Sequence, residues 1–183
     1  MDVVDWARNE AQHALRSATQ RWAHTQAVAE RATEIAGVVA IEDRGTLVAA
    51  AYLHDIGYGA DLAATGFHPL DGAVWLQAQG RERLARLVAH HSGARFEAAA
   101  RGYAERLAEF SQERSAVGGR AHVLRSDDGP DRRAVSVAGR LGEIKVRYGP
   151  TSPVTRAITA ATDTLTAAVA RTQARVDALS RAQ

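Results

Sequence analysis

His54 and Asp55 stand side by side at the end of an apolar run, residues 47–53. Both are residue types that bind metal ions. An ionised carboxylate in an apolar interior costs several kcal/mol unless a cation or hydrogen bonds compensate its charge. The adjacent imidazole and carboxylate therefore predict a metal site.

Further histidines lie in segments whose apolar residues recur at helical spacing. His24 precedes the pair, and His68, His90 and His91 follow it. On a helix over residues 81–91, His91 shares the apolar face, whereas His90 lies about 100 degrees away from it. His91 is therefore the better candidate ligand of the two, and His90 is a further candidate.

The chain contains no cysteine, which excludes disulfides, thiolate nucleophiles and sulfur-ligated metal sites. Any metal must be held by nitrogen and oxygen atoms. Such ligands suit divalent iron, manganese, zinc, cobalt or nickel, and affinity order alone does not choose among them. We therefore expect one or two divalent ions whose identity stays open.

Helical spacing of apolar residues and abundant alanine predict an all-α fold, because no segment shows the two-residue alternation of strands. Glycine and proline mark several expected ends: Gly37 and Gly57 stop helices, and Pro69 belongs to the first turn of another. The expected helices cover residues 3–17, 19–36, 43–55, 81–91, 135–148 and 154–179, and another begins within residues 66–73.

The 183 residues, of which 46% are hydrophobic, suffice for one domain with its own core. No run approaches the ~18 to 20 apolar residues that a membrane span needs, and residues 1–6 lack the features of a secretory signal. We therefore expect a cytoplasmic location. The net charge is only +2, and the interspersed basic residues argue against nucleic acid as a partner.

Four short motifs follow one another in the chain: Arg-Trp-Ala-His at 21–24, Leu-His-Asp-Ile-Gly at 53–57, Phe-His-Pro-Leu-Asp-Gly-Ala at 67–73 and Ala-His-His-Ser-Gly at 89–93. This series resembles the HD superfamily of metal-dependent phosphohydrolases. The resemblance implies an HD-domain helical bundle that forms a single domain over residues 1–183. Its motif core would span about 20–125, and C-terminal helices would span about 135–182.

The resemblance also implies a ligand set. His24, His54 and Asp55 would hold a first metal, and Asp55 would bridge to a second metal held by His68 and His91. A carboxylate suits the bridge because its two oxygens can each face a cation. The extra histidines look like the dinuclear branch, which includes bacterial HD-type hydrolases of dinucleoside tetraphosphates.

The implied reaction is cleavage of a phosphate ester or anhydride in a nucleotide or similar small molecule. Two metals about 3.5 to 4 Å apart polarise a phosphoryl oxygen and generate hydroxide from a bound water. His54 and Asp55 would be the catalytic residues in this scheme. Arg21, Tyr58 and Arg95 are candidates for contacts with the substrate, since a guanidinium matches phosphate geometry.

The chain departs from the HD pattern after the last histidine motif. A later helical aspartate normally completes the first metal site, but residues 118–133 form a polar, glycine-containing stretch. Asp127 and Asp128 in this stretch are further candidate ligands. If neither binds, the first metal has only three protein ligands, and we expect weaker binding and low activity.

Residues 118–130 can be encoded by nucleotides that spell a different sequence when they are read one base out of phase. The alternative reading is Ala-Asp-Ala-Leu-Thr-Tyr-Cys-Asp-Pro-Thr-Thr-Gly-Pro, which has helical character. Its second aspartate falls at the position of Arg125 and resembles the missing ligand. Our hypothesis is that compensating frame changes rewrote this segment.

Two other functions remain open. Some HD relatives use a similar ligand set in dinuclear iron oxygenases, which would stop working without oxygen. A non-catalytic regulator that binds metal or nucleotide is the second, motivated by the missing final aspartate. The sequence does not identify the substrate, the pathway or the oligomeric state.

Overall fold

A computed structural model describes residues 2–113, 115, 117, 142, 146 and 149–181. Every element assigned to these residues is an α-helix or a short 3-10 helix, which confirms the expected all-α fold. Within the same residues, no helix combines the length and the apolar character needed to cross a bilayer.

Helix α3 (Arg44–Leu53) forms the centre of the fold. It packs against α1 (Val3–Ala14), α2 (Thr19–Glu34) and α5 (Glu82–Ala89). Most of its residues are buried, and many of them are alanines, whose small side chains let the neighbouring helices approach closely. The end of α3, which carries the His-Asp pair, is thereby held in the interior. The buried residues of α3 are Leu47, Val48, Ala49, Ala50, Ala51 and Leu53.

Helix α4 (His68–Ala78) packs against α5 and against η3 (Ile56–Tyr58), the short turn that follows α3. The contact with η3 depends on Gly57. A Cβ atom at this position would lie 2.2 Å from the carbonyl oxygen of His68, far inside van der Waals contact. The missing side chain therefore brings the start of α4 against the turn that carries the His-Asp pair.

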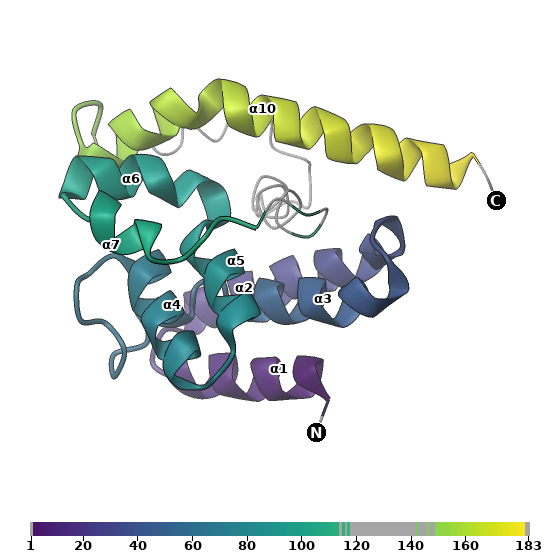
Figure 1. The fold of residues 1–183 in the computed structure, drawn as a ribbon, viewed down its shortest axis with the longest axis horizontal. Coiled ribbons are helices and arrows are strands. Elements are labelled where there is room, and N and C mark those ends of the chain that lie inside the picture. Colours follow the sequence, from purple (N-terminus) through teal and green to yellow (C-terminus); the bar gives the residue numbers. More distant parts are fainter. Residues whose placement is uncertain are drawn as a thin grey trace.

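The chain continues through η4 (His91–Gly93), α6 (Ala94–Arg101) and α7 (Ala104–Ala108). The long helix α10 (Pro153–Ser180) packs against α6 and η4 on the opposite side of the molecule from α1 (Figure 1). The extent of α10 confirms the long C-terminal helix that the alanine-rich pattern predicts over residues 154–179. The expected helix over residues 135–148 lies almost entirely outside the described residues.

The remaining short elements connect α2 to α3. They are η1 (Ala36–Val38) and η2 (Ile41–Asp43), and both adopt 3-10 geometry. Arg83 of α5 ties this connection to α5, because its Nη1 donates to Asp43 at 2.7 Å. The same guanidinium donates to Glu113 beyond α7, so one arginine joins three segments that lie far apart in the chain.

Candidate metal centre

The His-Asp pair lies at the point where α3 ends and η3 begins. His54 still has helical backbone angles, φ −58° and ψ −34°, whereas Asp55 leaves the helix at φ −103° and ψ 9°. The Asp55 side chain is fully buried and that of His54 nearly so. Because α3 ends just before the pair, the Asp55 carboxylate lies in the interior beside the His54 imidazole, as the sequence predicts.

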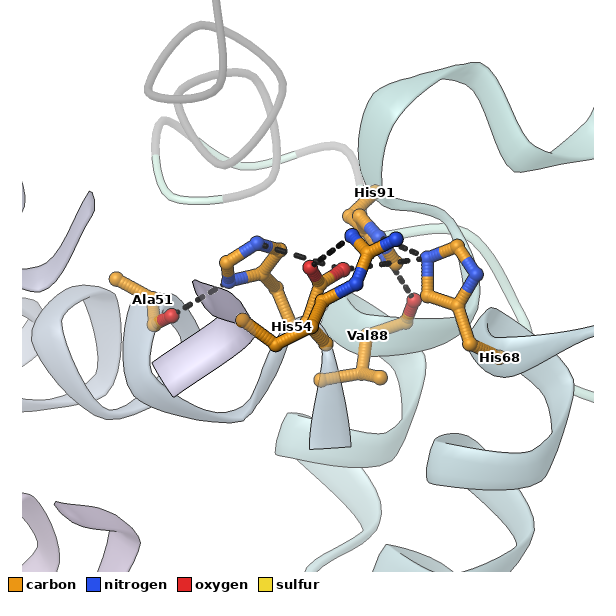
Figure 2. A network of polar contacts seen from close by, with 7 residues as sticks. Ala51, His54, His68, Val88 and His91 are labelled. Atoms are coloured by element: carbon orange, nitrogen blue, oxygen red, sulfur yellow. Dashed lines mark hydrogen bonds and ion pairs between the residues drawn. The ribbon is translucent and has the colours of Figure 1, made fainter. Parts of the chain in front are cut away.

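Two more histidines approach the same carboxylate from other segments. His68 is the first residue of α4, and His91 follows α5 at the start of η4. Both are buried, and Figure 2 shows their rings directed toward His54 from separate elements. The Nε2 atoms of His68 and His91 are 3.2 Å apart.

The backbone after His91 accounts for its position. Ser92 has φ 52° and Gly93 has φ 72°, so two consecutive residues adopt the left-handed conformation. For the serine this conformation is uncommon and somewhat strained. The turn ends α5, leaves His91 facing the interior and starts α6 in a new direction.

The predicted ligands form two overlapping groups. His24, His54 and Asp55 make one group, and Asp55, His68 and His91 make the other. Within each group the potential ligand atoms all lie within 4.8 Å of one another. The five residues therefore come together from α2, the end of α3, the start of α4 and the start of η4, with Asp55 shared by both groups.

Backbone carbonyls orient two of the imidazoles. Nδ1 of His54 lies 2.7 Å from the carbonyl oxygen of Ala51, and Nδ1 of His91 is similarly close to that of Val88. A neutral imidazole that donates from Nδ1 keeps its lone pair on Nε2. This assignment gives both rings a metal-binding nitrogen directed into the cluster (Figure 2).

Asp55 balances its charge against a nearby arginine. Nη1 of Arg21 donates to Oδ2 of Asp55 at 3.0 Å. The other oxygen, Oδ1, lies 3.5 Å from His54 Nε2 and 3.3 Å from His68 Nε2. The carboxylate thus faces a cationic side chain with one oxygen and imidazoles with the other.

Comparison with known protein families gives a match that covers this cluster. The model of the HD domain matches residues 21–141, well over half of the chain. The chain belongs to the HD-domain family. Neither the curated proteins nor the solved structures gave a match. HD domains are generally metal-dependent phosphohydrolases, which agrees with a buried cluster of histidine and aspartate.

The donor set of this HD domain fits a divalent cation. Only nitrogen and oxygen atoms are offered, they converge on one buried carboxylate, and two Nε2 atoms approach each other to 3.2 Å. Two imidazole nitrogens at such a distance share either a proton or a cation. His24, His54, Asp55, His68 and His91 are the residues that could hold such ions.

Some of the predicted site residues do not lie in the ligand cluster. His90 belongs to neither ligand group, and its Nε2 lies 2.5 Å from the carbonyl oxygen of Phe110. Arg95 is exposed, with its guanidinium carbon 4.5 Å from the centre of the Phe96 ring. Asp127 and Asp128 lie outside the described residues, as does the segment of the frame hypothesis.

One buried acid escaped the sequence analysis. Asp71, in the first turn of α4, accepts hydrogen bonds from the backbone nitrogen of Thr65 at 3.0 Å and from its hydroxyl at 2.8 Å. The Thr65 hydroxyl in turn accepts from the backbone nitrogen of Phe67. These bonds fix the residues just before His68. In the sequence, Asp71 is marked only as an acidic residue near the start of an expected helix. Such residues are common on protein surfaces, so the pattern does not indicate that Asp71 is buried.

Proposed function

We propose that this HD domain is a metal-dependent phosphohydrolase that cleaves a phosphate ester or anhydride of a nucleotide or similar small molecule. The main support for this proposal is that the two ligand groups share one buried carboxylate, that of Asp55. A shared carboxylate can join two metal ions through its two oxygens, and it supports membership of the dinuclear branch. Activity on dinucleoside tetraphosphates follows as the first substrate to test.

The five ligands divide the work of holding the ions. His24 and His54 would hold one cation, His68 and His91 would hold the other, and Asp55 would contact both. Divalent cations, when bound by these residues, would supply charge that polarises a phosphoryl oxygen and lowers the pKa of a bound water. The carbonyls of Ala51 and Val88 keep two of the imidazoles in the tautomer that this role needs.

The polar surroundings of the cluster favour an anionic substrate. Arg21 is 30% exposed while it contacts the buried Asp55, so its guanidinium reaches both the site and solvent. Tyr58 lies against this guanidinium, 3.8 Å from its carbon to the ring centre. Arg95 lies two residues beyond Gly93 at the start of α6 and adds a further positive charge on this part of the chain. These residues remain our candidates for contacts with substrate phosphate.

We further propose that residues 1–183 act as one domain. The helix α10 packs onto α6 and η4, the element that begins with His91, so the C-terminal helix supports the metal cluster. Loss of this helix would remove its packing on α6 and η4, where the Cβ atom of Ala161 lies 3.3 Å from the position that a Cβ atom would take at Gly93. A truncated chain is therefore expected to lose metal affinity as well as stability.

The test is an assay of the metal-loaded full chain against dinucleoside tetraphosphates, mononucleotides and simple phosphate esters. Mn²⁺, Fe²⁺, Co²⁺, Ni²⁺ and Zn²⁺ are supplied separately, and each reaction runs with and without oxygen. Oxygen-independent release of phosphate or of nucleotide supports the proposal. Product that forms only with oxygen and Fe²⁺ indicates an oxygenase, and tight binding without turnover indicates a regulator.

A matched pair of variants identifies the site. Asp55→Asn keeps the size of the side chain but removes the charge from both ligand groups, so turnover is expected to disappear. Asp61→Asn also removes an aspartate paired with an arginine, but that pair is exposed, with its atoms 2.9 Å apart. Asp61→Asn is expected to keep full activity. Equal activity in both variants would refute the assignment of Asp55.

A further inference from the structure

Arg21 reaches the carboxylate of the cluster from the first turn of α2. Its Nη1 is 3.0 Å from Asp55 Oδ2, and its side chain is 30% exposed, while that of Asp55 is 0% exposed. The same guanidinium therefore contacts a buried anion and solvent. A ligand that enters from solvent meets Arg21 without first displacing a buried side chain.

The two oxygens of Asp55 have different neighbours. Oδ1 faces the imidazoles of His54 and His68 at 3.5 and 3.3 Å, and Oδ2 accepts the hydrogen bond from Arg21. A carboxylate that joins two cations can offer one oxygen to each. A guanidinium stays protonated, so Arg21 holds a permanent positive charge on the second oxygen. Oδ1 lies between the two ligand groups, and with Arg21 on Oδ2 it is the one oxygen that Asp55 can offer to both cations. A second cation that takes an oxygen of its own must compete with Arg21 for Oδ2.

Stacking holds Arg21 in this competing position. Its guanidinium carbon lies 3.8 Å from the centre of the Tyr58 ring, on which the planar group gains cation–π attraction. The Tyr58 ring in turn stacks on His68, with centroids 4.1 Å apart and planes 16° apart. The arginine, the tyrosine and a candidate ligand therefore form one layered unit beside Asp55.

We infer that Arg21 controls the loading of the second cation. While Arg21 holds Oδ2, the cluster binds one cation tightly and a second one weakly. A phosphate group, which a guanidinium recognises through paired hydrogen bonds, draws Arg21 away from Asp55 and opens Oδ2 to the second cation. Because binding linkage is reciprocal, phosphate and the second cation strengthen each other's binding. This inference rests on the proposed role of the cluster as a cation site.

The test is calorimetric titration of the metal-free full chain with Mn²⁺, in nitrate and in inorganic phosphate at equal ionic strength. For the wild type in nitrate we expect one tight site and a second site about tenfold weaker, which phosphate tightens by about tenfold. In Arg21→Ala and Arg21→Gln we expect two tight sites without phosphate. Gln keeps a polar side chain of similar length, so it serves if Ala perturbs folding.

Arg16→Ala is the matched control. Its guanidinium also pairs with an aspartate at 2.9 Å, but both side chains are more than half exposed and lie outside the ligand groups. This variant is expected to titrate like the wild type. Unchanged or weaker second-site affinity in both Arg21 variants overturns the inference and leaves the proposed function standing. A wild type that binds no Mn²⁺ in either medium overturns the proposed function and the inference together.

Discussion

The backbone of Gly57 lies directly against the carbonyl group of His68. A Cβ atom at residue 57 would come within 2.2 Å of that oxygen and within 2.7 Å of the backbone nitrogen of Gly72. Both neighbours are backbone atoms, so no flexible side chain can move aside. The turn after the His-Asp pair and the start of α4 can therefore pack together only around a glycine.

Replacement of Gly57 by Ala is expected to destabilise the fold by about 2 to 3 kcal/mol, because α4 must shift away from η3. The shift also moves His68, so metal affinity is expected to fall. Urea unfolding and metal titration measure the two effects. Gly37→Ala is the control, because a Cβ atom there meets nothing within 4 Å. If both variants unfold at the same urea concentration, the close contact does not limit the packing.

The adjacent histidines are expected to respond differently to substitution. His91→Ala removes a ligand from the group that contains His68, so one of the two cations is expected to be lost. His90→Ala removes the hydrogen bond to the Phe110 carbonyl, which costs about 1 kcal/mol of stability but leaves the cations bound. Elemental analysis and thermal unfolding of both variants check this. Loss of metal in His90→Ala alone would reverse the assignment.

The Arg83–Glu113 pair is expected to make stability depend on pH. The hydrogen bond from Arg83, aided by the Ser115 hydroxyl, lowers the pKa of Glu113 below its ordinary value, although burial opposes the shift. A lowered pKa means that the unfolded chain binds more protons, so the contribution is complete above about pH 5 and disappears as pH falls through the folded-state pKa.

Glu113→Gln is therefore expected to cost about 1 kcal/mol near neutral pH, with a difference from the wild type that shrinks as the solution is acidified. Urea unfolding over a pH series measures it. Glu34→Gln, which alters a surface pair with Arg31, is the control and is expected to change stability by less than about 0.5 kcal/mol. A cost for Glu113→Gln that does not vary with pH would contradict the explanation.

The frame hypothesis predicts the nucleotide sequence of the gene. Codons for residues 118–130 should spell the Tyr-Cys-Asp reading one base out of phase, with compensating changes on either side. Resequencing the gene from genomic DNA decides the matter. Codons that do not contain this reading end the hypothesis, and the search for the final ligand then returns to Asp127 and Asp128.

Sequence patterns predicted where helices lie better than where they end. The helix expected over 43–55 stops at Leu53, because Asp55 leaves helical backbone angles and a 3-10 turn begins at Ile56. The short helices α6 and α7 were not anticipated. They are bounded by Ser92, Gly93 and Gly102, all of which have positive φ, and they are too short to show a clear apolar period.

The candidate ligands could be predicted from the sequence because histidine and aspartate in an apolar setting are chemically distinctive. The residues that contact and orient these ligands could not be predicted. Arg21 and Asp55 are 34 residues apart, and the stacking of Tyr58 on His68 depends on the contact of η3 with α4. Such pairings follow from tertiary packing and leave no local spacing for a sequence pattern to reveal.

Metal content tests the central claim most directly. Wild type, Asp55→Asn and Asp61→Asn are dialysed against Mn²⁺ with inorganic phosphate, freed of excess ion and measured by elemental analysis. We predict about two Mn²⁺ per chain in the wild type and in Asp61→Asn, and almost none in Asp55→Asn. A wild type without bound metal, or an Asp55→Asn protein that retains as much metal as the wild type, would contradict the account.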